Sequence, residues 1–208
     1  MILLSTIKET RSWLDQVRSD GKSIGFVPTM GALHEGHLNL VRRAKQENDI
    51  CVSSVFVNPT QFNNKEDLEK YPRNLARDAG MLEENGCDLL FAPEVEEMYP
   101  DGGNSLLELD FGPLGEVMEG KFRPAHFKGV ATIVHKLFSI TQPNQAYFGK
   151  KDYQQLAIIR EMVRQMNLPV KIVPCETVRE PDGLAMSSRN QRLNPHERML
   201  APLIFQVL

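Results

Sequence analysis

Short apolar runs alternate with longer stretches in which apolar residues recur every three or four positions. The runs contain many β-branched and aromatic residues, which is typical of buried strands. They predict strands over residues 24–28, 50–57, 88–92, 146–148 and 170–173. The longer stretches predict helices, because their apolar positions fall on one face of a helix. These helices are predicted over residues 35–47, 130–140 and 153–166, with a further helical segment over 65–84 that is interrupted near Tyr71 and Pro72.

Strands that alternate with helices at this spacing predict an α/β fold, a Rossmann-like parallel sheet with helices on both faces. In such a sheet, ligands bind at the carboxyl ends of the strands, where the crossover connections diverge. The residues that follow each predicted strand are therefore the first candidates for a functional site. Residues 100–104 are rich in turn-forming residues and predict a turn or an exposed loop.

The pattern changes after the last predicted strand. Residues 176–190 are polar and contain glycine. Asn194 and Pro195 predict the start of a helix that runs to the end of the chain, with Asn194 as its N-cap. We expect a Rossmann-like domain over residues 1–175, followed by a hinge segment and the beginning of an incomplete, smaller C-terminal domain over residues 176–208. The last helix is still apolar where it stops, which indicates that more chain normally follows.

The composition is that of an ordinary globular protein. Of the 208 residues, 41% are hydrophobic and 25% are charged, and the net charge is −3. Such a small charge gives no indication of nucleic-acid binding. The three cysteines form no CxxC pair, so neither a disulfide framework nor a zinc knuckle is predicted, and reduced thiols suit a cytoplasmic protein. We expect no signal peptide and no membrane-spanning segment.

The segment PTMGALHEGH at residues 28–37 joins a predicted strand to a predicted helix and is the strongest candidate for chemistry. Gly31 and Gly36 allow a ligand to approach the backbone closely, and the helix N-terminus favours phosphate. His34 and His37 lie one turn apart and can both donate hydrogen bonds to phosphate oxygens. Two alternatives remain. The glycines can form a tight turn while the histidines cap or pack, or the histidines can hold zinc, for which no third ligand stands out.

A second candidate is the pair of amides that follows the strand predicted over residues 50–57. Asn58 and Gln61 can donate to and accept from a substrate hydroxyl or carboxylate. The alternative is an ordinary turn stabilised by Asn58 and Pro59.

A third candidate is the segment YFGKKDYQQ at residues 147–155. Gly149 permits close approach, and the two lysines, Lys150 and Lys151, bring positive charge. Asp152 can hold a ribose or a metal-bound water, and Gln155 lies one turn further into the next helix. Alternatively, Asp152 is the N-cap of that helix and the lysines are a solvated charge pair.

The last candidate is the segment DGLAMSSRN at residues 182–190. Ser187 and Ser188 offer hydroxyls, and Arg189 offers a guanidinium, all of which suit phosphate oxygens. The composition is that of a flexible segment, so a closing loop and a polar hinge between domains are both compatible with it.

Together these segments resemble the pantothenate synthetase (pantoate–β-alanine ligase) family. The turn His34-Glu35-Gly36-His37 is similar to the HIGH-type signature of the nucleotidyltransferase superfamily that includes this family. The matching stretches follow one another along nearly the whole chain: FVPTMGALHEGH (26–37), VFVNPTQF (55–62), YPRN (71–74), MYPDG (98–102), RPAHFKGV (123–130), YFGKKDYQQLA (147–157) and VREPDGLAMSSRN (178–190).

The resemblance implies ATP-dependent condensation of pantoate with β-alanine. The product is pantothenate, the intermediate is pantoyl adenylate, and AMP and pyrophosphate are released. The resemblance also implies Mg²⁺ with ATP as co-substrate, a cytoplasmic homodimer, and no nucleic-acid or membrane partner. Residues 1–175 would then bind ATP and pantoate. The residues assigned to ATP in this way are Met30, Gly31, Ala32, Leu33, His34, Glu35, Gly36, His37, Gly149, Lys150, Lys151, Asp152, Val178, Met186, Ser187, Ser188 and Arg189.

The resemblance also assigns roles within this set. His34, His37 and Lys151 are the expected catalytic residues, and we expect them to act by neutralising charge on the phosphates. Val178 would meet the adenine through its backbone, and residues 186–189 would correspond to the KMSKS loop of the superfamily.

The remaining assignments concern the acyl acid and the metal. Gln61 and Gln155 are expected to hold pantoate. Arg123 and His126 are expected to support the site, and Asp78 is a candidate for approaching magnesium, whose ligands are otherwise not identified.

Two other functions remain open at this point. A nucleotidyltransferase of the same superfamily would transfer AMP to a phosphate and stop there, but arginine or lysine would then be expected at positions 61 and 155. A non-catalytic nucleotide-binding fragment is the other alternative, because family members continue into a smaller C-terminal domain that closes over the site.

Overall fold

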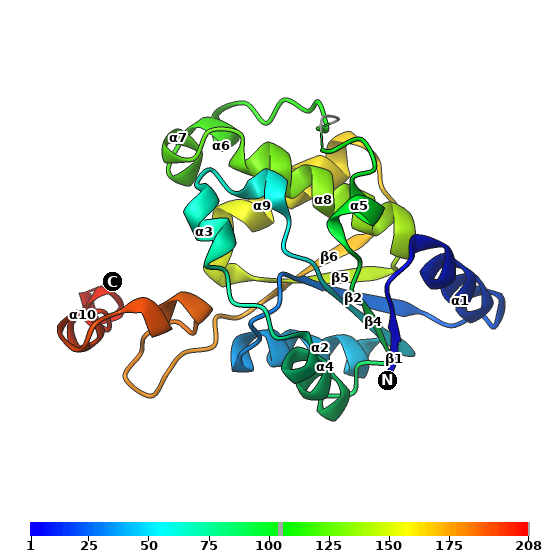
Figure 1. Ribbon diagram of the computed structural model, residues 1–208, viewed down its shortest axis with the longest axis horizontal. Coiled ribbons are helices and arrows are strands. Elements are labelled where there is room, and N and C mark those ends of the chain that lie inside the picture. The colour runs from blue at the N-terminus through cyan, green and yellow to red at the C-terminus, as the bar shows by residue number, and fades with distance from the viewer. Residues whose placement is uncertain (104–105, 208) are drawn as a thin grey trace.

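The computed structural model describes residues 1–103 and 106–207. Within them the chain forms a six-stranded sheet in which every neighbouring pair of strands is parallel, in the order β1-β4-β3-β2-β5-β6 (Figure 1). The strands are β1 (Ile2–Leu4), β2 (Ile24–Thr29), β3 (Ile50–Val55), β4 (Leu89–Phe91), β5 (Gln145–Gly149) and β6 (Lys171–Cys175).

Helices cover both faces of the sheet. Figure 1 shows α8 and α9 on one face and α2 and α4 on the other. The α-helices are α1 (Ile7–Ser19), α2 (Glu35–Glu47), α3 (Lys65–Glu69), α4 (Leu75–Glu84), α5 (Val95–Met98), α6 (Pro113–Glu116), α7 (Glu119–Phe122), α8 (His126–Thr141), α9 (Tyr153–Gln165), α10 (Pro195–Leu200) and α11 (Leu203–Val207). Three 3₁₀ turns are also present in the described residues: η1 (Pro59–Gln61), η2 (Lys150–Asp152) and η3 (Ser188–Arg192).

Successive strand residues supply two separate cores, because side chains alternate between the faces of a sheet. Phe26 packs into the core beneath α1, α8 and α9, whereas the next residue, Val27, packs into the core beneath α2 and α4. Leu89 and Leu90 of β4 divide in the same way. This burial on both faces explains why the strands read as continuous apolar runs. The predicted Rossmann-like α/β fold is confirmed.

The predicted elements lie where the apolar pattern placed them, with one error at the C-terminal end. The helix expected from residue 195 to the end of the chain is wrong, because α10 ends at Leu200 and α11 begins at Leu203. Pro202 lies between them, and proline has no backbone N–H with which to continue a helix. Residues 100–103 form the expected turn, while Asn104 and Leu208 lie outside the described residues.

Two elements near the N-terminus were not predicted. Strand β1 has only three residues, too few to show alternation. Helix α1 does carry a local signal that was missed, since the Thr6 hydroxyl accepts from the backbone N–H of Glu9 at 3.2 Å and donates to the Glu9 carboxylate at 2.6 Å. A threonine followed three residues later by glutamate is a recognised helix start.

The strand order reverses between β2 and β5, and this reversal places the site. The chain runs from β2 through β3 to β4 in one direction, whereas β5 and β6 lie on the other side of β2. A crevice forms outside the carboxyl ends of the strands at such a switch point. The turn after β2 and the turn after β5 both open into this crevice. In Figure 1, the segment that follows β6 extends away from the sheet at this same end.

Candidate active site

The turn between β2 and α2 is held in shape by a buried carboxylate. Gly31 and Ala32 both have positive φ angles, 78° and 51°. Asp78 of α4 is 2% exposed, and its two oxygens accept the backbone N–H groups of Ala32 and Leu33, each at 2.9 Å. A Cβ atom at residue 31 would lie 2.8 Å from an oxygen of Asp78, so glycine is required there. Asp78 therefore fixes the conformation from which the two histidines project.

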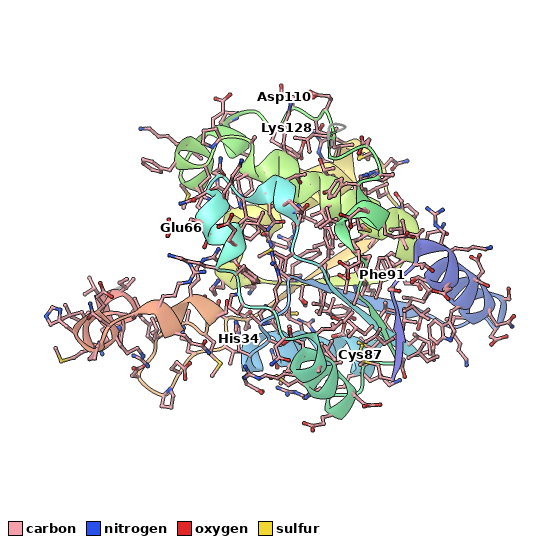
Figure 2. The ribbon with its side chains drawn as sticks, in the orientation of Figure 1. His34, Glu66, Cys87, Phe91, Asp110 and Lys128 are labelled. Atoms are coloured by element: carbon pink, nitrogen blue, oxygen red, sulfur yellow. The ribbon has the colours of Figure 1, made fainter. Side chains whose placement is uncertain are left out.

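The two histidines form a reciprocal cap at the start of α2. Nδ1 of His34 accepts from the backbone N–H of Gly36 at 3.1 Å, and Nδ1 of His37 accepts from the backbone N–H of His34 at 3.4 Å. A nitrogen that accepts from an amide carries no proton, so in each neutral ring the proton lies on Nε2. The ring centroids are 4.1 Å apart. Figure 2 shows His34 at the end of α2 nearest the C-terminal segment. Capping and ligand binding are therefore compatible, since Nδ1 serves the helix and Nε2–H is left to donate.

Both imidazoles are neutral at physiological pH. Burial, followed by repulsion from a protonated His34 and from Lys151, lowers the pKa of His37 from 6.5 to about 3. Burial, followed by the charge of Lys151, also lowers the pKa of His34. A neutral ring with its proton on Nε2 is a hydrogen-bond donor, but it has no acidic proton to transfer easily. This arrangement favours stabilisation of phosphate charge over proton donation by His37.

The lowered pKa of His37 predicts a loss of stability in acid. Below pH 6.5 the unfolded chain binds a proton at this residue that the folded chain does not bind until about pH 3. The free energy of unfolding should therefore fall as the pH is lowered through this window, by at most about 1.4 kcal/mol per pH unit for one proton. His37→Gln keeps an amide that can cap α2, and it should flatten this dependence in urea unfolding followed across the window. Equal slopes for wild type and His37→Gln would contradict the assignment.

Three segments distant in sequence line one cavity of about 580 Å³ outside the sheet edge. These are the turn after β2, the turn after β5 and the polar segment before α10. The predicted residues that line it are Met30, His34, His37, Gln61, Lys151, Asp152, Gln155, Ser187, Ser188 and Arg189. The convergence of these segments, which the sequence could only suggest, is therefore present in the structure.

A smaller cavity of about 150 Å³ adjoins the large one and shares residues with it. Gln61, Gln155 and Asn58 contribute amides to its lining. The apolar part of the lining consists of Phe56, Val130, Ile133, Val134, Leu137 and Phe148. Of the described residues that line it, none is lysine or arginine.

A third cavity, of about 90 Å³, is also lined by both histidines. It is lined by Gly149, Val178 and Met186, together with Leu40 of α2. A narrow, partly apolar space beside a cluster of phosphate donors suits a flat aromatic base.

Several predicted residues lie elsewhere. The ammonium of Lys150 pairs with Glu176, and the carboxylate of Glu35 pairs with Arg42. Leu33 is 3% exposed and packs into the core under α2. Gly31 shapes the turn through its backbone and lines none of the three cavities. Ala32, Leu33 and Glu35 line a different cavity of about 490 Å³, which His34, Met186, Ser187 and Ser188 also line.

The residues expected to support the site do contact it. Nδ1 of His126 lies 2.8 Å from the carbonyl oxygen of Gln61, and Nη2 of Arg123 donates to the same oxygen at 3.5 Å. Both side chains also line the large cavity. They hold the η1 turn against the start of α8.

Several residues that line the large cavity were not assigned to the site from sequence, and Tyr71 and Asp67 are two of them. Tyr71 lines both the large cavity and the smaller one that adjoins it, and the only signal for it was its position in the YPRN stretch. Asp67 of α3 accepts from Arg189 at 3.2 Å and from Arg192 at 2.7 Å, which ties the polar segment to α3. Nothing local in the sequence marks Asp67, because its partners lie more than a hundred residues away.

The carboxylates of the site do not form a metal cage. Within residues 1–103 and 106–207, no three His, Cys, Asp or Glu side chains are grouped so that they could hold a metal ion. Both oxygens of Asp78 accept backbone N–H groups of the turn after β2.

No described helix is both long and apolar enough to traverse a lipid bilayer.

Comparison with known proteins agrees with this geometry. The sequence model of the family described as pantoate–β-alanine ligase matches residues 2–208. Pantothenate synthetase from Aquifex aeolicus is 57% identical over 205 residues, which are 99% of this chain and 72% of that protein. The crystal structure of pantothenate synthetase from Thermus thermophilus is 53% identical, with a TM-score of 0.93, over 100% of this chain and 73% of that one.

A further solved structure carries ligands. Pantoate–β-alanine ligase from Francisella tularensis, complexed with β-γ ATP and β-alanine, is 43% identical, with a TM-score of 0.93, over 99% of this chain and 78% of that one. Identity at this level along nearly the whole chain goes well beyond a shared fold. The chain therefore belongs to the pantoate–β-alanine ligase family.

Proposed function

We propose that this chain joins pantoate to β-alanine in two steps, using ATP and passing through pantoyl adenylate. One observation carries the proposal: hydrogen-bond donors from three segments line a cavity that shares residues with a second cavity, and amides and apolar side chains line that second cavity. The first space suits a triphosphate, and the second suits a small, branched hydroxy acid.

In the first step the pantoate carboxylate attacks the α-phosphorus of ATP and pyrophosphate leaves. Negative charge grows on the phosphate oxygens in this transition state, so the chain's task is to place donors around them. The Nε2–H groups of His34 and His37 supply two neutral donors. The ammonium of Lys151 donates to the carboxylate of Asp152 at 2.8 Å in this structure. Lys151 supplies a full positive charge once it leaves Asp152 and contacts the phosphates. Arg189 can supply a guanidinium fork by releasing Asp67 in the same way.

In the second step the amine of β-alanine attacks the acyl carbon and AMP leaves. The adenylate is an activated acyl group that water can also attack, so the site must exclude water while the amine enters. Arg123 and His126 line the large cavity beside Gln61, whose carbonyl oxygen both side chains contact. Residues 187–189 also line this cavity. They belong to residues 176–208, which we propose comprise a hinge segment and the beginning of a smaller C-terminal domain.

The acyl pocket, the smaller cavity lined by Gln61 and Gln155, distinguishes this proposal from a simple nucleotidyltransferase. A phosphorylated acceptor would require cationic side chains, whereas no lysine or arginine is among the described residues that line this cavity. The two methyl groups of pantoate match the apolar wall, and its hydroxyl and carboxylate groups match the amides.

The direct test is to incubate the protein with ATP, pantoate and β-alanine and to follow products by mass spectrometry. Pantothenate and AMP should appear in equal amounts. Release of AMP without an amide product would overturn the proposal. Turnover by the 208-residue chain, compared with that of a form extended at its C-terminus, separates a non-catalytic nucleotide-binding fragment from an active ligase.

Gln61→Ala should weaken the binding of pantoate far more than the binding of ATP. Loss of one amide that contacts a charged or hydroxylated substrate should raise the dissociation constant for pantoate by about tenfold, since such a hydrogen bond contributes about 1.5 kcal/mol. Isothermal titration with pantoate and with a non-hydrolysable ATP analogue gives both constants. Gln16→Ala, at an exposed position on α1, should change neither. Equal weakening of both ligands would show that Gln61 is placed incorrectly.

Three further features follow from the family and are part of this proposal. Magnesium enters with ATP as its complex, which fits a site whose donors suit phosphates and whose carboxylates form no cage. The chain works in the cytoplasm as a homodimer. Light scattering during gel filtration measures the mass of the particle and tests the dimer.

A further inference from the structure

We propose that Tyr99 is a positioning residue for the acyl acid, acting through Asn58 to hold the carboxamide of Gln61 with its NH₂ group toward the acyl pocket. The inference rests on the proposed function, in which Gln61 contacts pantoate. Tyr99 itself lines none of the cavities described above. Its effect on the substrate therefore has to pass through its neighbours.

The first step is the orientation of the Asn58 amide, which a backbone carbonyl determines. One end of this amide lies 3.2 Å from the carbonyl oxygen of Gly129. A carbonyl oxygen can only accept, so the group that faces it must be the NH₂ of Asn58. The oxygen of Asn58 must then point the other way, where the hydroxyl of Tyr99 donates to it at 2.8 Å and that of Thr60 at 3.1 Å. Tyr99 and Thr60 therefore stabilise one of two possible amide orientations.

The second step is the orientation of the Gln61 amide. The same NH₂ group of Asn58 lies 3.1 Å from the side-chain oxygen of Gln61. Since Asn58 donates here, Gln61 must present its oxygen to Asn58 and its own NH₂ group to the other side. That NH₂ group now lies 3.0 Å from the sulfur of Met30, which also lines the acyl pocket. A thioether is a weak acceptor, so a carboxylate or hydroxyl oxygen of a substrate can readily replace it.

Burial strongly disfavours the reversed orientation of either amide. Asn58 is 1% exposed, Tyr99 is 3% exposed and Gln61 is 8% exposed. Water is then a poor substitute for a missing partner, and a reversed amide would face like groups at both ends. If the Gln61 amide were reversed, its carbonyl oxygen would face the pantoate carboxylate and repel it. The hydroxyl of Tyr99 thus stabilises the orientation in which the NH₂ group of Gln61 faces the substrate carboxylate.

Tyr99 makes a second contact, through its ring and the ammonium of Lys136, and a test variant has to retain it. This ammonium lies 4.6 Å from the centre of the Tyr99 ring, over the ring face. Tyr99→Phe retains the ring and this contact and removes only the hydroxyl. Thr60→Val removes the other donor to Asn58 with little change of shape. Tyr153→Phe, at a side chain that is 66% exposed, is the matched control.

The experiment is a double-mutant cycle read as binding constants in the full 208-residue chain. Tyr99→Phe and Thr60→Val should each raise the dissociation constant for pantoate by about fivefold, the scale of one buried hydrogen bond. The constant for a non-hydrolysable ATP analogue should stay within about twofold, and Tyr153→Phe should change neither. In a Gln61→Ala background, Tyr99→Phe should have no further effect on pantoate, because the group through which it acts is gone.

The outcomes separate the inference from the proposed function. If Gln61→Ala leaves pantoate binding unchanged, the placing of pantoate against Gln61 is wrong. If Gln61→Ala weakens pantoate but Tyr99→Phe does not, the inference alone fails. An equal effect of Tyr99→Phe with and without Gln61, or an equal loss of the ATP analogue, would show a purely structural role and overturn it.

Discussion

His37→Ala is expected to slow formation of the acyl adenylate by about 10²-fold or more, the scale seen when one preorganised donor to a developing charge is removed. The reason lies in the reciprocal cap at the start of α2. The cap at His34 and the turn held by the buried Asp78 fix the ring beside the large cavity, and its Nε2–H is left to donate before ATP arrives. Alanine leaves that part of the cavity without a donor. Because the ring is neutral, the loss should appear without a new pH dependence of the rate near neutrality.

Pantoate-dependent exchange of labelled pyrophosphate into ATP measures this step without β-alanine. The affinity for ATP should change much less than the exchange rate, because the donor acts mainly in the transition state. His196→Ala, at an exposed position outside the site, should exchange at the wild-type rate. An exchange rate for His37→Ala within about tenfold of wild type, with the variant folded, would remove His37 from the catalytic set.

Much of the fold was predictable because its elements carry their own signals. Helix α2 was predicted over the residues that it occupies, since one apolar stripe runs along it from the end of a glycine turn. The strands were recognisable because they are buried on both faces and read as apolar runs. The failures have local causes: β1 is too short to show a period, and Pro202 interrupts a stretch that is otherwise apolar.

The meeting of the site's segments was predictable for a different reason. In a parallel sheet every strand ends at the same edge, so polar residues after β2 and β5 had to lie near one another. The parallel sheet predicts the edge at which these residues gather, but it does not predict the conformation of the turns there. The contact between Asp78 and the turn after β2 could not be predicted in this way. Asp78 lies 46 residues from Ala32 and 45 residues from Leu33, and a single sequence gives no sign of such a contact.

The sequence also left open whether the histidines cap the helix or bind a ligand, and the structure shows why this was not a true choice. An imidazole has two nitrogens, and each ring uses Nδ1 for the backbone. The cap therefore determines which nitrogen carries the proton. Similarly, Asn58 was predicted either to stabilise a turn or to face a substrate. It is buried, it is among the residues that line the acyl pocket, and it donates to the side-chain oxygen of Gln61.

Gly129→Ala is expected to destabilise the protein, although alanine is the better helix former. In an open helix this change would stabilise by up to about 1 kcal/mol. Here a Cβ atom would lie 2.4 Å from the carbonyl oxygen of Thr60 and 2.9 Å from the Cα of Gln61, both backbone atoms of the η1 turn. Either α8 or the turn must shift, so a net loss of about 1–3 kcal/mol in the free energy of unfolding is expected. The shift would also move the Gln61 amide and weaken pantoate binding.

Gly80 in α4 provides the matched control for this change. It also lies within a helix, but a Cβ there would meet nothing within 4 Å. Gly80→Ala should therefore raise the free energy of unfolding in urea while Gly129→Ala lowers it. Opposite signs for the same substitution would show that close contact between α8 and the η1 turn decides the result, because helix propensity favours alanine at both positions. If both variants were stabilised, α8 would not press against the backbone that carries Gln61, and the positioning of that amide would need another cause.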